Sequence, residues 1–346
     1  MRHHPFLAAL GLSLALAGAG ASAQPEAPPA TEAPAVDSTL LESLVVKAVR
    51  PGPAFWKVSD GDSTVWVMGV PASLPRGVRW RHDELKAHLR NANVLIVGTS
   101  GYTINILDIL KLIFTAKQFK ADQPLDKTLS PAQMARFDAA RKDLGVSDRV
   151  LELRPGFAAM ALSGSFQRSL NMQDGQPERA ITRDAFLKVG TERVGRSAVV
   201  DLIKMFNDMP AKASESCMDD ALRQVEAGKA RQLEAARGWT TGDLRVAISA
   251  ERGFEHCIAD DPKIKAEVDR NISEVTAAIA EALKKPGKSV AIVDLRPLLS
   301  QGGILVRLQA MPGVTLTAPD APGLEDEIGA EAAEPEKPPE ATAPAA

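Results

Sequence analysis

The sequence contains few of the residues and motifs on which enzyme chemistry most often depends. Its 346 residues include five histidines, two cysteines and one tyrosine. It has no G-x-S-x-G nucleophile elbow, and Ser163-Gly164-Ser165-Phe166 does not fit that pattern. It also has no Walker loop and no G-x-G-x-x-G turn, so we interpret Gly302-Gly303 as a loop entering a helix rather than a phosphate cradle. Motifs alone therefore identify no catalytic group and predict no cofactor.

The histidines are too scattered to predict a metal site. His82 and His88 lie six positions apart in a predicted surface helix, on different faces of it, so we expect both to be solvated. His256 precedes Cys257, and we interpret it as a packed or exposed residue at a helix end rather than half of a metal pair. The sequence therefore predicts no bound metal.

Positive charge is not in excess. The chain has 41 Lys and Arg against 44 Asp and Glu, a formal net charge of -3 and a pI near 6.0. Nucleic-acid-binding domains usually carry a basic footprint, so no nucleic acid is expected as a partner.

No apolar run is long enough for a comfortable bilayer span, which needs about 20 residues. The longest candidate, Phe6–Leu16, follows the basic start Met1–His4 and precedes Ala21-Ser22-Ala23, the A-x-A pattern of signal-peptidase sites. No cysteine follows the run, which disfavours a lipid anchor. We therefore predict a signal peptide at 1–23, cleaved after Ala23, and a periplasmic or secreted protein without a transmembrane anchor after cleavage.

Composition divides the remaining chain into three parts. Residues 24–37 are rich in Pro and Ala and predict a linker. Residues 38–317 predict one large folded domain. Residues 318–346 are acidic, rich in Pro and Ala and free of aromatic residues, and predict a disordered tail.

Within the folded part, hydrophobic patterns predict both strands and helices. Two runs of β-forming residues, 55–60 and 63–70, flank Asp60-Gly61 and indicate a hairpin. Short apolar runs at 94–97, 198–200 and 289–293 are typical of buried strands.

Helices are predicted over most of the remaining segment. Ser130, Pro131 and Gln133 favour a capped helix that ends at Gly145. Ile272, Val275, Ile279 and Leu283 form an apolar stripe. We therefore predict an α/β fold, with a central mixed sheet built from N- and C-terminal strand–helix units and a large helical insertion.

The two cysteines fall at the far ends of two predicted helices, 217–236 and 241–257, with Thr240 and Asp243 offering a capping box for the second. If the helices form an antiparallel hairpin, Cys217 and Cys257 face each other, and an oxidising compartment favours a disulfide. The alternative is a pair of buried free thiols.

Both ends of the folded segment resemble the TraB/GumN family. The resemblance rests on the hairpin FWKVSDGDSTVWVMGV, the following Leu74-Pro75, the strand VLIVG, and the closing segments SVAIVDLRPL and GGILVRLQAMPGVTL. The helical middle matches more weakly. The family is similar to Tiki-type membrane metalloproteases. The resemblance thus implies an α/β fold in which two Gly-x-x-His turns and nearby carboxylates meet at a divalent-metal site.

This sequence departs from the family pattern at the implied site. Ala72 and Pro297 occupy the two His positions, and Gly98 occupies the position of a Glu. Asp201 retains only a carboxylate where the family has a second Glu, and Arg270 is kept. The candidate polar residues of a cleft are then Asp201, Arg270, Asp294 and Arg296.

Three functions remain open. The first is a non-catalytic family member that binds an envelope protein or a peptide, or acts as a scaffold in the envelope. The second is a metal-dependent hydrolase or peptidase with relocated chemistry around Asp201, Asp294 and Arg296. The third is a structural envelope protein without a ligand.

Overall fold

The computed structural model describes residues 40–98, 101–103, 119–174, 189–194, 196–250, 257 and 262–333. The predicted signal peptide and linker, His256 and the predicted tail from residue 334 lie outside these residues. Among the helices that are described, none has the length and apolar composition needed to cross a lipid bilayer.

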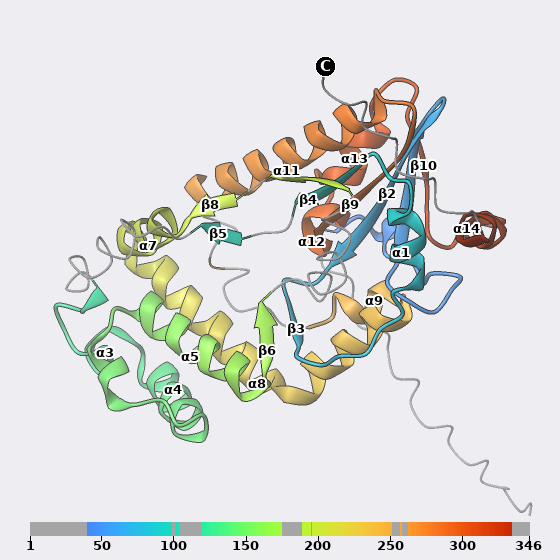
Figure 1. The fold of residues 1–346 in the computed structure, drawn as a ribbon. Coiled ribbons are helices and arrows are strands. Elements are labelled where there is room, and N and C mark those ends of the chain that lie inside the picture. Colours follow the sequence, from blue (N-terminus) through green and yellow to red (C-terminus); the bar gives the residue numbers. More distant parts are fainter. Residues whose placement is uncertain are drawn as a thin grey trace, which may run out of the picture. The chain divides into compact units, whose positions relative to one another are not determined.

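A six-stranded mixed sheet forms the centre of the fold (Figure 1). The predicted hairpin is confirmed, and its second strand pairs in parallel with a strand from the far end of the chain. Both strands of that parallel pair are almost entirely buried, as expected for strands with helices on both faces. In spatial order the strands are β10 (Thr315–Thr317), β1 (Phe55–Asp60), β2 (Ser63–Val70), β9 (Gly287–Asp294), β4 (Val94–Gly98) and β7 (Gly190–Arg193).

Two small sheets lie outside the central one. Strand β3 (Ser73–Pro75) pairs with β6 (Met172–Asp174), and β5 (Gly101–Thr103) pairs with β8 (Arg196–Ala198). The predicted strand at 198–200 is wrong beyond Ala198, because helix α7 (Val199–Asp208) begins there. Three apolar residues in a row fit a buried helix as well as a buried strand.

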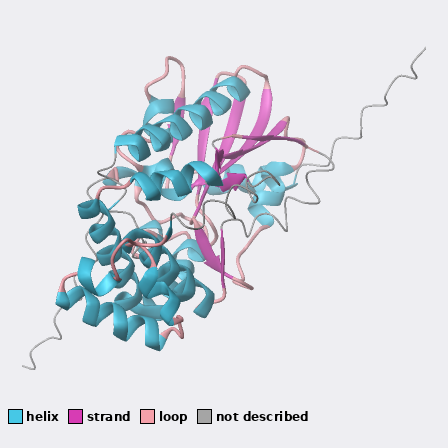
Figure 2. Cartoon of the chain, turned by 90° about the vertical axis from the view of Figure 1, so that its left-hand side faces the viewer, coloured by secondary structure: helices cyan, strands magenta, loops and turns pink. Residues whose placement is uncertain are grey.

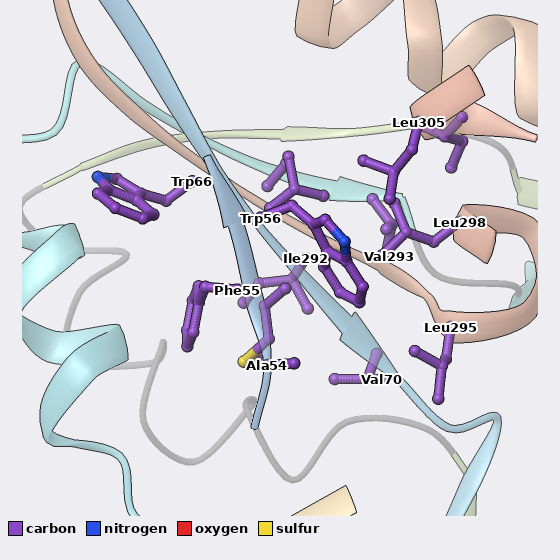
Figure 3. Close-up of a cluster of buried hydrophobic side chains, with 14 of the residues drawn as sticks. Ala54, Phe55, Trp56, Trp66, Val70, Ile292, Val293, Leu295, Leu298 and Leu305 are labelled. Carbon is purple, nitrogen blue, oxygen red and sulfur yellow. The ribbon is translucent and has the colours of Figure 1, made fainter. Parts of the chain in front are cut away.

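Helices cover both faces of the central sheet. Figure 3 shows Trp56 on the side of Leu298 and Leu305, and Phe55 and Trp66 on the opposite side. The predicted apolar stripe of the long C-terminal helix is buried in the first layer, which confirms it. That layer consists of α11 (Pro262–Leu283), α12 (Leu295–Leu299) and α13 (Ile304–Gln309), and the second layer of α1 (Asp83–Leu89) and α14 (Leu324–Ala333).

His88 is buried, which makes its predicted solvation wrong. Its ring stacks on Trp66 with 4.0 Å between centroids and meets the edge of Phe55 at 4.9 Å. Helix α1 presents this residue to the sheet together with Leu85 and Leu89. His82 precedes the helix at its N-cap and is half-buried. His88 thus packs in the core as an aromatic residue would. The spacing of His82 and His88 along the helix does not show whether either side chain is buried.

Part of the predicted disordered tail is ordered. Helix α14 buries Leu324 and Ile328 in the main core, and its Glu327 forms an ion pair with Lys57 of β1. Two apolar residues four positions apart were sufficient to dock one helical face, although the surrounding composition is acidic and rich in Ala.

The chain before β1 is tied to three distant segments through its backbone. It contains a short 3-10 helix, Glu42–Leu44. The N–H groups of Leu41, Ala48 and Val49 donate to the carbonyls of Leu299 (2.9 Å), Gly242 (2.9 Å) and Pro319 (3.1 Å), respectively.

The predicted helical insertion is confirmed (Figure 2). It has a second apolar core of its own. The capping box at Ser130 and Gln133 is present, and Gly145 follows the helix with a positive φ of 65°. The elements are α3 (Leu125–Thr128), α4 (Pro131–Asp143), a 3-10 helix (Asp148–Glu152), α5 (Pro155–Ser169), α7 and the first half of α8 (Ala211–Thr241).

Helix α8 connects the two cores and changes direction once. Cys217 and Leu222 lie in the insertion core, whereas Ala236 and Trp239 lie in the main core. Between them Gly228 adopts φ 78° and ψ 175°, a backbone region that only glycine occupies readily. The change of direction at Gly228 thus allows the two halves of α8 to pack in different cores.

The predicted helix 241–257 is wrong in extent, but the disulfide that it suggested is present. Helix α9 covers only Leu244–Ala247 and is capped by Asp243, while Thr240 lies inside α8. Cys217 and Cys257 are bonded, with their Cα atoms 4.8 Å apart. Both are buried in the insertion core, and the Cys257 N–H donates to the buried carboxylate of Asp220 at 2.8 Å.

Replacing Cys217 and Cys257 together by Ala should lower the free energy of unfolding by about 4 kcal/mol, the chain-entropy value for a loop of 40 residues. Urea unfolding measures the loss. Reductant should shift the wild-type midpoint toward that of the double variant and leave the variant unchanged. Equal midpoints under oxidising conditions would contradict a stabilising role.

Candidate functional site

The parallel strands β2, β9, β4 and β7 end at one edge of the central sheet. The register pairs Val70 of β2 with Asp294 of β9, and Val293 of β9 with Gly98 of β4. Because the carboxyl ends of adjacent parallel strands meet at the same edge, residues that follow them gather there. Ala72, Gly98 and Asp294 therefore belong to one edge of the sheet.

A small cleft opens at this edge, with a volume of about 70 Å³. Small-molecule sites are usually larger, from roughly 300 Å³ upward, so the cleft fits a single small side chain or a few waters. Its walls are mostly apolar. The lining residues are 70–74 after β2, Gln232, Ala235 and Ala236 of α8, Ala247, Ile248 and Ala250 at α9, and 294–296 at the start of α12.

Among the described residues, three side chains that line the cleft carry a charged or an amide group. Asp294 is 6 % exposed and Gln232 is 9 % exposed. Arg296 is half-buried and its Nη2 donates to the carbonyl of Ile248 at 2.8 Å, which joins α12 to the end of α9. The site therefore offers a carboxylate, an amide and a guanidinium that is partly used to hold the wall.

The sequence-predicted residues divide between this cleft and other places. Ala72, Asp294 and Arg296 line the cleft together. Gly98 and Pro297 lie near the same edge but are not lining residues. Asp201 belongs to α7, and its side chain is outside the described part of the chain.

Arg270 is not among the lining residues either. It is exposed on α11 and forms ion pairs with Glu267 and with Glu274, the latter at 2.9 Å. The hydrogen bond to Glu267 raises the pKa of its guanidinium. Its place in the fold is thus a charged helix surface.

Gly98 is packed too closely to be replaced by a ligand residue. A Cβ added at this position would lie 2.6 Å from Cγ2 and 2.9 Å from Cγ1 of Val275 on α11. A glutamate there would collide with the helix that covers the sheet. Glycine at position 98, in place of the glutamate that the family resemblance implies, is therefore consistent with the packing, because Val275 of α11 occupies the space that a side chain would need.

The residues at this edge do not fit the divalent metal that the family resemblance implies. Ala72, Gly98 and Pro297 offer no side-chain donor, and among the described residues Asp294 is the one carboxylate that lines the cleft. In the part of the chain that the structure describes, no three His, Cys, Asp or Glu side chains are grouped closely enough to hold a metal ion. No step through a metal is derived for this site.

Sequence reasoning missed the wall contributed by α8 and α9. Trp239 Nε1 donates to the carbonyl of Gly69 at 2.8 Å, which fixes the end of β2 against α8. Gly238 allows the close approach of α9, because a Cβ there would lie 2.6 Å from the backbone nitrogen of Ala247. The Gly238-Trp239 pair near the end of a long helix was the available sequence signal. It does not identify the carbonyl that Trp239 binds, because Gly69 is 170 residues away.

Gly98→Ala should lower the free energy of unfolding by about 1–3 kcal/mol through overpacking against Val275. In a Val275→Ala background the same change should cost much less, because the two colliding methyl groups are gone and only Cβ of residue 275 remains, at 3.3 Å. Urea unfolding of the four proteins gives the coupling. Gly302→Ala is the control, since a Cβ there meets nothing within 4 Å. Strictly additive losses would contradict the close packing.

Comparison with known proteins gives one result. No curated protein sequence and no solved structure matched the chain. The sequence model of the TraB/PrgY/gumN family matches residues 54–317, which span the central sheet from β1 to β10, the cleft and the helical insertion. The chain therefore belongs to the TraB/PrgY/gumN family.

Proposed function

We propose that the protein is an exported, non-catalytic member of this family that binds a peptide or an envelope protein at the cleft beside Ala72 and Asp294. The observation that carries the proposal is the packing of Gly98 against Val275. It leaves no room for a glutamate where the family resemblance implies one. Ala72 and Pro297 remove the imidazoles at the same edge, so three of the implied ligands are replaced by residues without donors.

Two features support export. The first 23 residues have the pattern of a cleavable signal peptide. The Cys217–Cys257 bond is typical of proteins that fold in an oxidising compartment.

The chemistry of the cleft supports a binding role of limited size. A volume of about 70 Å³ with Ala, Ile and Leu walls suits one small apolar side chain of a partner. Asp294 adds a buried carboxylate that can accept a hydrogen bond from a backbone N–H or an amine of that partner.

A hydrolase with relocated residues is the second candidate, because Asp294 and Arg296 share the cleft. The purified protein, dialysed after exposure to Mn, Co or Zn and assayed on unstructured peptides, should retain no stoichiometric metal. It should also cleave no faster than Asp294→Asn. Asp320→Asn, a change at an exposed carboxylate, is the matched control. Stoichiometric metal with peptidase activity that only Asp294→Asn abolishes would establish the hydrolase instead.

A photoreactive amino acid in place of Ala72, which is exposed at the cleft, should cross-link one discrete partner in envelope preparations. The same group at exposed Lys229 on α8 should not. A binding protein contacts its partner at the cleft, whereas a structural protein without a ligand gives the same background at both positions. Equal labelling at Ala72 and Lys229 would therefore favour the structural function.

A further inference from the structure

The loop between β3 and α1 carries a short, strongly basic sequence. Arg76, Arg79 and Arg81 are all exposed and lie within six residues. Trp80 between them is half-buried, with its ring 5.3 Å from that of Trp239. The packed indole holds the loop against the end of α8.

The fold brings further positive charge to this loop. Arg81 lies beside Gly52, since a Cβ at Gly52 would be 3.9 Å from Cβ of Arg81. A Cβ at Gly242, after α8, would lie 2.8 Å from the carbonyl of Gly52 and 3.4 Å from that of Arg50. The end of α8 and the chain before β1 therefore adjoin the loop. We define the basic surface as Arg50, Arg76, Arg79 and Arg81.

These positive charges have no ion-pair partner among the described residues. None of the four side chains forms an ion pair with a carboxylate in the part of the chain that the structure describes. Two nearby acidic groups are already used, because Asp243 caps α9 and Glu42 pairs with Arg245 at 3.5 Å. Asp83 and Glu84 begin α1 directly after the loop, and α14, which packs against α1, carries Glu325 and Asp326 at exposed positions. The four cationic side chains are thus unpaired among the described residues, on a chain whose net charge is -3.

We propose that the basic surface docks the protein on an anionic lipid bilayer. Exposed arginines gain from the surface potential of anionic headgroups, and a half-buried tryptophan among them is typical of residues at headgroup depth. A nucleic acid is a poorer fit, because nucleic-acid-binding domains usually carry a larger basic footprint.

The docking would also orient the cleft. Ser73 and Leu74 line the cleft, and Arg76 follows them directly after Pro75. A bilayer bound at Arg76 would therefore lie two residues along the chain from the cleft lining. This proposal goes beyond the function proposed above and does not depend on it, because the surface would bind lipid whether or not the cleft has a ligand.

Vesicle co-sedimentation of the full chain tests the proposal, with vesicles of 30 % phosphatidylglycerol in phosphatidylcholine and vesicles of phosphatidylcholine alone. Arg76→Gln, Arg79→Gln and Arg81→Gln combined should weaken binding to the anionic vesicles by about 100-fold, at roughly fivefold per basic residue. Lys142→Gln, Arg149→Gln and Lys229→Gln combined remove the same charge from exposed positions of the helical insertion and should leave binding unchanged. The apolar run at 6–16 is present in every variant and acts on both vesicle types.

The outcomes separate clearly. Preferential binding to anionic vesicles that salt reverses and only the loop variant loses supports the proposal. Equal binding to both vesicle types, or equal losses in both triple variants, overturns it. Binding to a soluble sulfated polysaccharide but not to vesicles also overturns it, in favour of a polyanion site. If the loop variant unfolds, Arg50→Gln provides the comparison from the adjoining segment, with an expected loss of about fivefold.

Discussion

Strands β2 and β9 come from opposite ends of the folded chain, and the rest of the structure depends on their parallel pairing. A parallel pair requires a crossover, and here the crossover contains the whole helical insertion. The pairing is buried on both faces, by α11 and α12 on one side and by α1 on the other. It also decides where the cleft lies, since the residues after Val70 and those from Asp294 onward emerge side by side. Contacts at such a long sequence separation form only after an unfavourable loop closure.

Local sequence signals predicted local structure well. The Ser130 and Gln133 capping box, the turn at Gly61 and the stripe through Ile279 each depend on residues within a few positions of one another. Predictions failed where tertiary contacts decide. His88 is buried because Trp66 and Phe55 lie opposite it, and Val199 joins a helix although its neighbours suggest a strand.

The sequence predicted which residues follow the strands at the candidate site, but not the tertiary contacts around them. The positions of Ala72, Asp294 and Gly98 at one sheet edge follow from parallel strands and from the family resemblance. Nothing within a few residues of Gly98 indicates that Val275 fills the space above it, because that contact spans 177 positions of sequence. The α8 wall was missed for the same reason, because Trp239 contacts Gly69, 170 positions away. Arg270 differs, since its ion-pair partners Glu267 and Glu274 lie within one helical turn of it.

The hydrogen bond between Val49 and Pro319 joins two segments that both lie outside the family match at 54–317. These flanking pieces are part of the fold, since Leu44 and Val45 on one side and Leu324 and Ile328 on the other are buried in the main core. A fragment cut at the limits of the family match would expose the faces that these four residues cover and leave Lys57 without Glu327. Recombinant fragments of this protein should therefore extend from Leu40 to at least Ala333, because the boundary of homology falls inside the boundary of the folding unit.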